Sequence, residues 1–310
     1  MKATMRRYQH AEDYWRIREF LREIHLINNR LQNSWEVARF DYWRWHGILN
    51  MKDGTLETDV FIWETPDGRI DAVLNREAPG SVWIQVRPES RTESLEKEML
   101  SVAEEHLTVR TKRNTHHLHV WCLEENLLRQ EILKRCGYAP SEKRKTEYQR
   151  TCDLTREILP VPLAEGYTIR PLGDVDEHNA RSWLSWRAFH PDEPDENHQG
   201  HDWYANIQRA PLYRRDLDLI VVAPDGTHAA FCTIWFDDVT RTGLFEPVGT
   251  SPEHQRKGLG KALMTEGLRR LKHAGADLAY VGSFTPPAHA LYASVGFTDY
   301  RLLIPWDKEL

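Results

Sequence analysis

The distribution of hydrophobic and polar positions predicts alternating strands and helices along the chain. Short apolar runs flank Pro66–Asp67–Gly68 and again Pro224–Asp225–Gly226, so each turn sequence is predicted to join two strands of a hairpin. Farther on, leucines recur at helical spacing after a glycine-rich turn and predict a helix that runs to about Lys272, before Gly275. These leucines are Leu259, Leu263, Leu268 and Leu271.

The same order of predicted elements occurs twice, at a spacing of about 160 residues. Each copy is expected to contain helices, then a hairpin, then strand, helix, strand, helix and strand. We therefore expect the α/β class, in an α+β arrangement with a mixed sheet, as two tandem domains of residues 1–158 and 159–310. The boundary is placed at Leu159–Gly166, which is rich in Pro and Gly. The matching segments are Thr4–Arg7 with Thr168–Pro171, Ile84–Pro88 with Val248–Pro252, and Leu133–Tyr138 with Tyr292–Phe297.

Charge and composition argue against a nucleic acid or a membrane as the binding partner. The net charge of the 310-residue chain is −6 at pH 7, which argues against a nucleic-acid partner. No apolar run approaches the length of a membrane-spanning helix, so no membrane partner is expected. The four cysteines show no paired spacing and are interpreted as reduced thiols of a cytoplasmic protein.

The segment Gln255–Gly260 has the composition of an anion-binding loop. A glycine-rich turn that opens a helix leaves several backbone N–H groups unpaired, and these donors together with the helix dipole favour a phosphate group. A nucleotide-binding P-loop would need Ser or Thr at position 262 and Gly at 255, where Ala262 and Gln255 stand. A dinucleotide fingerprint would need a third Gly at Leu263.

Three motifs together resemble the GNAT superfamily of acyl-CoA N-acyltransferases. Gln255–Gly260 is similar to its Q/R-x-x-G-x-G/A pyrophosphate loop, and Val248-x-Thr250-x-Pro252 is similar to the end of its fourth strand. Ala288–Phe297 resembles its A-x-x-L-Y-x-x-x-G-F signature. The resemblance is close from about Tyr167 to Leu310, and the two-domain layout resembles mycothiol-synthase-like acetyltransferases.

The resemblance implies acetyl-CoA as cosubstrate and no metal. It places the cofactor in a cleft between strands Phe245–Thr250 and Leu278–Ser283, with backbone groups near Val248 and Thr250 holding the pantetheine arm. Thr285 is a further candidate contact, although the family often has Asn there, whose reach is longer. The pyrophosphate is assigned to Gln255, Arg256, Lys257, Gly258, Leu259, Gly260 and Lys261.

Tyr292 is the candidate general acid for the departing CoA thiolate, by its match to the signature. Glu246 is the candidate general base, because it stands on the strand beside the expected acetyl position. Asp237 and Asp238 are rival bases acting through water. Simple packing remains the alternative for Tyr292, and solvent exposure or pairing with an arginine remains the alternative for Glu246.

The N-terminal copy is expected to be degenerate. Counting forward from Pro88 places Arg91–Glu96 opposite Gln255–Gly260, so both glycines are lost and two glutamates are added. Leu133 stands in the place of Tyr292. This copy is therefore predicted to keep the fold without catalysis.

The expected function is transfer of an acetyl group from acetyl-CoA to a primary amine of a small-molecule acceptor, by direct attack in a ternary complex. Alternatives are a different acyl-CoA or a non-catalytic CoA-binding sensor or scaffold. The acidic stretch Asp192–Glu196 suggests a cationic acceptor, whereas His190, His198 and His201 are interpreted as part of a solvated segment rather than a metal site. A monomer and a homodimer are both left open.

Overall fold

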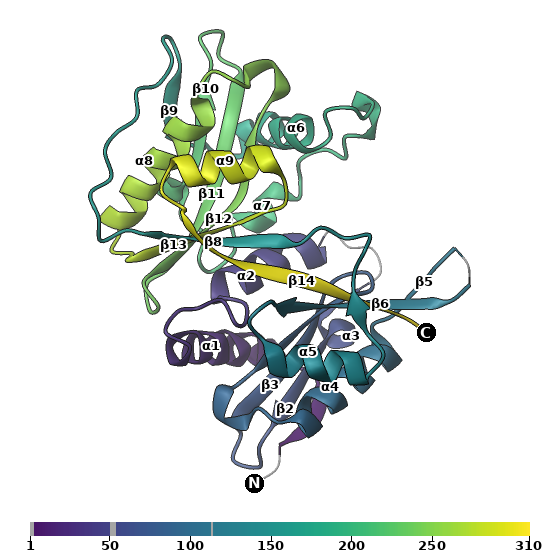
Figure 1. Ribbon diagram of the computed structural model, residues 1–310. Coiled ribbons are helices and arrows are strands. Elements are labelled where there is room, and N and C mark those ends of the chain that lie inside the picture. Colours follow the sequence, from purple (N-terminus) through teal and green to yellow (C-terminus); the bar gives the residue numbers. More distant parts are fainter. Residues whose placement is uncertain (1–2, 50–53, 113) are drawn as a thin grey trace. The chain divides into compact units, whose positions relative to one another are not determined.

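A computed structural model describes residues 3–49, 54–112 and 114–310, which form two compact units (Figure 1). The first unit contains Met1–Tyr148 together with Arg301–Leu310, and the second contains Gln149–Tyr300. This division differs from the predicted domains 1–158 and 159–310. Strand pairing decides which unit a segment joins, whereas the Pro- and Gly-rich Leu159–Gly166 lies inside the second unit, where Leu163 and Ala164 pack against its core.

The first unit has a mixed sheet in the order β1-β2-β3-β4-β6-β14, with β5 pairing β6 and β7 pairing β14. Only β4 and β6 pair in parallel among its described strand pairs. Its elements are β1 (Thr4–Arg7), α1 (Ala11–Ile27), α2 (Val37–Tyr42), the π-helical turn η1 (Trp43–Ile48), α3 (Leu56–Asp59), β2 (Val60–Glu64), β3 (Ile70–Ala78), β4 (Ser81–Val86), η2 (Pro88–Ser90), α4 (Glu93–His106), β5 (Val109–Arg110), β6 (His116–Leu123), α5 (Leu127–Arg135), β7 (Ala139–Pro140) and β14 (Asp299–Glu309).

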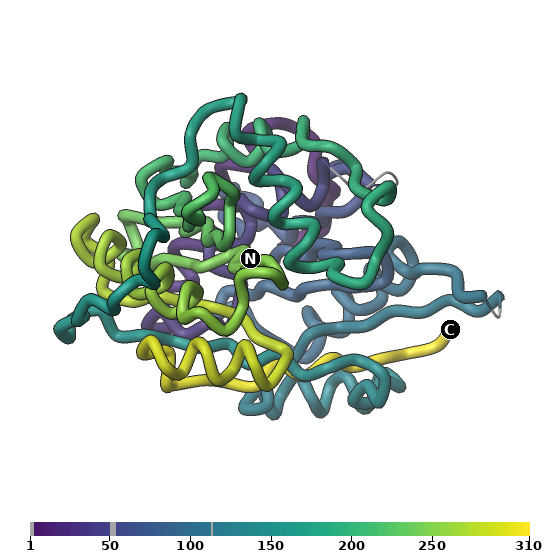
Figure 2. Tube along the Cα trace, turned by 90° about the horizontal axis from the view of Figure 1, so that it is seen from above, coloured from purple at the N-terminus to yellow at the C-terminus, as the bar shows by residue number. Residues whose placement is uncertain are grey.

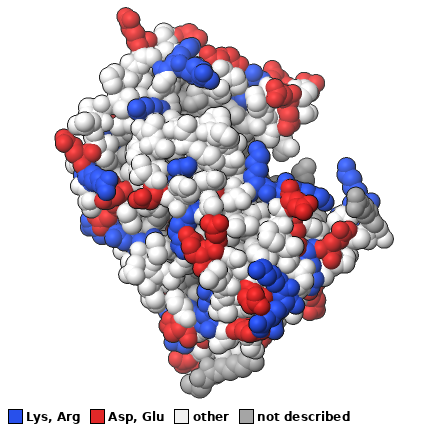
Figure 3. Space-filling model, viewed as in Figure 1, with Lys and Arg blue, Asp and Glu red and all other residues white. Residues whose placement is uncertain are grey.

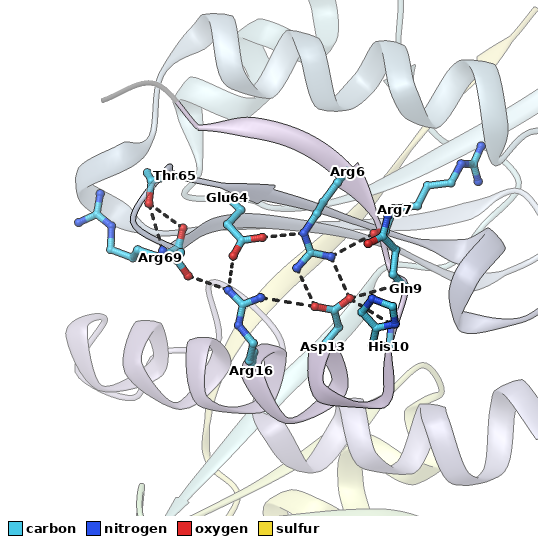
Figure 4. A network of polar contacts seen from close by, with 10 residues as sticks. Arg6, Arg7, Gln9, His10, Asp13, Arg16, Glu64, Thr65 and Arg69 are labelled. Atoms are coloured by element: carbon cyan, nitrogen blue, oxygen red, sulfur yellow. Dashed lines mark hydrogen bonds and ion pairs between the residues drawn. The ribbon is translucent and has the colours of Figure 1, made fainter.

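A network of charged side chains joins the first strands of this unit to its first helix (Figure 4). Arg6 on β1 donates to Asp13 on α1 at 2.6 Å and to Glu64 on β2 at 2.6 Å. Arg16 on α1 contacts both carboxylates as well. Because each carboxylate is shared by two guanidinium groups, the network fixes the edge of the sheet against α1.

The second unit has its sheet in the order β8-β13-β12-β11-β10-β9. The pairs β9–β10, β10–β11 and β11–β12 are antiparallel, and β12–β13 is parallel, so the predicted mixed α/β class is confirmed. Its elements are β8 (Glu147–Asp153), β9 (Thr168–Pro171), η3 (Val175–Glu177), α6 (His178–Phe189), η4 (Asp195–Asn197), α7 (Tyr204–Ile207), η5 (Arg215–Leu217), β10 (Asp218–Val222), β11 (His228–Asp237), β12 (Thr242–Thr250), η6 (Pro252–His254), α8 (Leu259–His273), β13 (Leu278–Ser283) and α9 (Pro286–Ser294).

Helices cover both faces of the second unit's sheet, and two glycines permit their close approach (Figure 1). At Gly267 in α8, a Cβ atom would lie 2.6 Å from Ile234 Cδ1 on β11. At Gly249 on β12, a Cβ atom would lie 2.5 Å from the Phe231 ring and 3.0 Å from Ala188 on α6. A larger residue at either position would require the neighbouring side chains or the helix to shift.

The two units exchange their final strands. After α9, the chain leaves the second unit and β14 pairs antiparallel with β6, from Leu303↔Leu123 to Glu309↔His117. Figures 1 and 2 show this yellow C-terminal strand running along the blue-green β6. After β7 and Tyr148, the chain leaves the first unit, and β8 lies beside β13 in the second. The internal repeat therefore describes the order of elements but not their division between the units.

Acidic and basic side chains are interspersed over the molecular face shown in Figure 3. Among the described helices, none combines the length and the apolar character needed to cross a membrane. All four cysteines are free thiols.

Candidate active site

Two parallel strands of the second unit separate part-way along their length. Strands β12 and β13 pair only from Thr242↔Leu278 to Leu244↔Tyr280, yet they continue to Thr250 and Ser283, all within described residues. The paired part of β12 is buried, whereas every residue from Glu246 to Thr250 is partly exposed. The separated strands thus offer an edge of backbone N–H and C=O groups for a bound molecule, at the two strands that the sequence predicted for the cleft.

A β-bulge lies at the start of this open edge. The register passes from Ile234↔Phe245 to Cys232↔Val248, so β12 has one residue more than β11 across this step. The indole Nε1 of Trp235 donates to the carbonyl oxygen of Glu246 at 2.7 Å and fixes the bulged backbone. A bulge re-aims nearby side chains, and Glu246 stands within this one.

The N-terminus of α8 provides unpaired backbone donors. Gly258 is the N-cap residue, its φ of 75° lies in the left-handed region, and it offers no side chain to cap the helix. The backbone N–H of Ala262 bonds to the Gly258 carbonyl at 3.1 Å, so the three preceding N–H groups, from Leu259 to Lys261, have no acceptor within the helix. A Cβ atom at Gly258 would meet no atom within 4 Å. Open space, free donors and the positive end of the helix dipole together suit an anion.

The other residues of the predicted pyrophosphate loop fall into two groups. Arg256, Lys257 and Lys261 are exposed around the helix N-terminus. The side chain of Leu259 is buried in the core, so only its backbone is placed to bind a ligand. Gly260 is needed for packing as well, because a Cβ atom there would lie 3.2 Å from Leu291 of α9.

Side chains within the loop also hold its shape. Gln255 Nε2 donates to the Thr250 carbonyl at 3.3 Å, which folds the loop back onto the end of β12. Lys257 Nζ donates to the hydroxyl of Tyr167 at 3.0 Å and to the Glu253 carbonyl at 3.3 Å. The sequence did not point to Tyr167, which lies far from the loop along the chain.

Tyr292 and Glu246 are brought near each other. Tyr292 on α9 is 8% exposed and belongs to the core that lies under the cleft. Burial raises the pKa of its phenol to about 12, with further contributions from the charge of Glu246 and from Cys232. The phenol is therefore protonated at neutral pH and close to a carboxylate, an arrangement that can supply a proton.

The two rival carboxylates lie elsewhere. Asp237 is buried, and its Oδ2 accepts from the backbone N of Thr240 at 3.1 Å and from the Thr240 hydroxyl at 2.7 Å. It pairs with Thr242, at the opposite end of β12 from the open edge. Asp238 is exposed in the same turn. The geometry therefore favours Glu246 as the base.

Thr285 is the N-cap residue of α9, where its exposed side chain makes no capping hydrogen bond. The next two residues are prolines, which have no backbone N–H, so the start of α9 offers fewer donors than the start of α8. A contact to the cofactor at this position would have to come from the Thr285 hydroxyl itself.

A second polar cluster, at the end of β13, was not predicted. Ser283 Oγ lies 2.8 Å from His289 Nδ1, and Arg150 Nε donates to Ser283 Oγ at 3.2 Å. Partial burial and the charge of Arg150 lower the pKa of His289. His289 stands three residues before Tyr292, so the helical spacing could have identified it. Arg150 lay outside the predicted C-terminal domain.

The first unit preserves the separated strands but not the anion site. Strands β4 and β6 pair at Ser81↔His119 and Val82↔Val120 and then part. However, the N-cap of α4 is Thr92, whose hydroxyl accepts from the backbone N of Leu95 at 3.1 Å.

The turn before the helix is shorter in the first unit than in the second. Two residues separate η2 from α4, whereas four separate η6 from α8, so Thr92 corresponds to Gly258 and Ser94 to Gly260. The predicted match of Glu96 to Gly260 was wrong, because turn length differs between the copies.

Among the described residues, no group of three or more His, Cys, Asp or Glu side chains is arranged to hold a metal ion.

Residues 178–297 match the family model described as the acetyltransferase (GNAT) family. This range contains the open edge of β12, the N-terminus of α8 and Tyr292. The second unit carries a GNAT acetyltransferase domain. The comparison does not test individual residues of the GNAT domain, so the assignments above stay predictions.

Sequence relatives that align with about three quarters of the chain agree with this result. A mycothiol acetyltransferase of Paenarthrobacter aurescens (strain TC1) is 24% identical over 254 residues, covering 77% of this chain and 71% of that protein. A second, from Pseudarthrobacter chlorophenolicus, is 25% identical over 237 residues, covering 72% and 68%.

Solved structures match both units together. A tandem GNAT protein from the clavulanic acid biosynthesis pathway superposes with a TM-score of 0.68 at 14% identity, covering 99% of this chain and 98% of that one. A GCN5-related N-acetyltransferase from Sphaerobacter thermophilus gives 0.67 at 15% identity, covering 99% and 95%. The chain therefore has the tandem GNAT fold.

Proposed function

We propose that this protein transfers an acetyl group from acetyl-CoA to a primary amine of a small-molecule acceptor, and that the reaction takes place in the second unit. The observation that carries the proposal is the pairing of an uncapped α8 N-terminus with the open edge of β12. The first would hold the pyrophosphate and the second the pantetheine arm. The names of the two sequence relatives support acetyl as the acyl group.

In the proposed reaction, the neutral amine attacks the thioester carbonyl while both substrates are bound. Backbone N–H groups on the open edge of β12 would stabilise the developing oxyanion, because fixed dipoles need no reorganisation. The C–S bond breaks, and Tyr292 gives its proton to the departing thiolate. Glu246 takes the proton lost by the attacking nitrogen, directly or through a water molecule. No protein nucleophile is required.

The acidic segment after α6 remains the proposed source of selectivity for a cationic amine. Arg187 offsets part of its charge, since it lies 3.6 Å from Asp195, and Glu193 lies 2.8 Å from the His190 ring. Neutralising Asp192 and Glu196 together should therefore raise KM for cationic amines. A KM that stays constant across amines of different charge would rule the segment out.

Calorimetric titration with acetyl-CoA tests the site. We expect one site per chain, lost in Gly258→Glu, because a carboxylate would then stand at the anion site. Gly275→Glu is the matched control: Gly275 also has a positive φ and open space around it, but it follows the C-terminal end of α8. Retained binding in that variant would show that charge at the cleft is responsible.

Turnover is tested by release of free CoA thiol during a screen of primary amines. Acetylation that is abolished by Gly258→Glu supports the proposal. Binding of acetyl-CoA without turnover of any amine would favour a non-catalytic sensor instead, and no binding at all would contradict the whole assignment.

A further inference from the structure

The first unit contains a polar cavity of about 520 Å³ that the proposed function does not use. It lies where β4 and β6 no longer pair, beside the N-terminus of α5. This position in the first unit corresponds to the position proposed for the cofactor in the second unit. Its volume is that of a site for a small molecule. Among the residues that line it are Asn33, Ser34, Arg91, Asn126, Arg129 and Arg301.

Positive charge exceeds negative charge at this cavity. Glu96 is fully buried and is shared by Arg91 and Arg129, with Arg129 Nε 2.9 Å from its Oε2. Among the described residues, Arg301 pairs with one carboxylate, that of Glu125, at 3.4 Å. Three guanidinium groups therefore face two carboxylates. Arg129 is buried, whereas the side chains of Arg91 and Arg301 keep 26% and 24% of their surface exposed. One bound anion would balance the excess positive charge.

Two amide side chains add hydrogen-bond donors. Asn126 Oδ1 accepts from Arg91 Nη2 at 2.5 Å, and Asn33 Oδ1 accepts from Arg301 Nη1 at 2.9 Å. Because both oxygens are used by arginines, the NH₂ groups of the two amides are oriented by these bonds and suited to an acceptor. Hydrogen bonds within the protein thus hold these arginine and amide side chains in place before a ligand binds.

The cavity does not fit acetyl-CoA. Arg129 Nη1 donates to the carbonyl of Ile84 at 3.0 Å, and Ile84 corresponds to Val248, where the pantetheine arm is expected in the second unit. Thr92 already caps α4, and acidic residues occupy its first turn. Side chains of the protein thus already bond to the backbone groups of β4 and of the α4 N-terminus that would otherwise hold the cofactor.

We propose that this cavity binds a small polar monocarboxylate, of the size of a hydroxy acid or an N-acylated amino acid. The excess of one positive charge matches a singly charged carboxylate better than a phosphate dianion. Guanidinium groups bind a carboxylate through two parallel N–H donors, and the amides and Ser34 can hold hydroxyl or amide groups of the ligand. This site is separate from the acetyl-transfer site and does not depend on it.

Calorimetry on the full chain tests the proposal with D-glycerate, L-lactate and N-acetylglycine as probes and inorganic phosphate as comparison. We expect saturable one-to-one binding of at least one carboxylate, weakened at least tenfold by Arg91→Met and by Arg301→Met. Arg135→Met is the matched control, because it removes the same charge from the exposed end of α5. Acetyl-CoA binding in each variant reports that the protein is folded.

Three outcomes would overturn the assignment: no saturable binding by any of the three carboxylates, equal affinity in both cavity variants and the wild type, or tighter binding of phosphate than of every carboxylate. Acetyl-CoA titrating a second site per chain that Arg91→Met removes would also overturn it, since the cavity would then be a cofactor site.

Discussion

The charge of Glu246 on β12 contributes to raising the pKa of Tyr292 on α9, so the strand and the helix hold a carboxylate and a phenol close to each other. They come from different elements, and Glu246 lies on the part of β12 that no longer pairs with β13. A base and an acid placed together at one opening can serve the two proton transfers that amine acetylation needs.

Replacing Tyr292 by Phe should lower kcat by about 100-fold and leave KM for acetyl-CoA nearly unchanged, since only the proton donor is removed. The ring would keep its packing with Phe297, 6.4 Å away between centroids, so folding should be preserved. Release of CoA thiol measures the rate. A variant with full kcat would reduce Tyr292 to a packing residue.

Deprotonation of Tyr292 should not lower the reaction rate at moderately alkaline pH. Burial and the charge of Glu246 raise the pKa of Tyr292 to about 12, so the phenol stays protonated until the pH approaches that value. The rate should therefore not fall between about pH 8 and pH 10. A fall in this window that disappears in Tyr292→Phe would contradict the raised pKa.

Glu246→Gln should lower kcat/KM by about 100-fold, because the amide accepts no proton from the attacking nitrogen. The backbone there is fixed by Trp235, so the side chain can change without disturbing the bulge. Asp238→Asn is the matched control, as it removes an exposed carboxylate at the other end of the cleft strand. If Asp238→Asn loses activity and Glu246→Gln does not, the base is Asp238 in the turn between β11 and β12.

Glu96→Gln should destabilise the protein by roughly 3–5 kcal/mol, because two arginines would lose the buried carboxylate that they share. Urea unfolding followed by tryptophan fluorescence measures this loss. Glu93→Gln, three residues earlier on α4, should change stability little. The side chain of Glu93 is 42% exposed, and those of its partners Lys97 and Arg135 are 44% and 55% exposed. Equal effects of the two substitutions would refute a special role for the buried network.

Local patterns predicted much of the second unit. The helix after Gly258 was predicted from the spacing of its leucines and from its flanking glycines, and the structure places it there. The strand Leu278–Ser283 was implied by the family resemblance and is also present. These features depend on neighbours within a few residues, which a sequence displays directly. The family resemblance then pointed to Tyr292 and Glu246, which the fold brings close together.

What the sequence did not predict depends on distant partners or on loop length. The division at Tyr148 and Gln149 follows from strands that pair across the whole chain, and no local signal marks it. The cluster of Arg150, Ser283 and His289 unites three separate elements. The shortened turn before α4 shifted the comparison of the two copies by two residues, because a repeat does not preserve turn length.

The pairing of β14 with β6 has a consequence for how the protein is made. On the ribosome, residues 303–309 emerge long after β6, so the sheet of the first unit has an unpaired edge while the second unit is being translated. That edge can recruit a wrong strand, from the same chain or from a neighbour, until the correct one arrives. The unit whose synthesis begins first is thus the one whose folding is completed last.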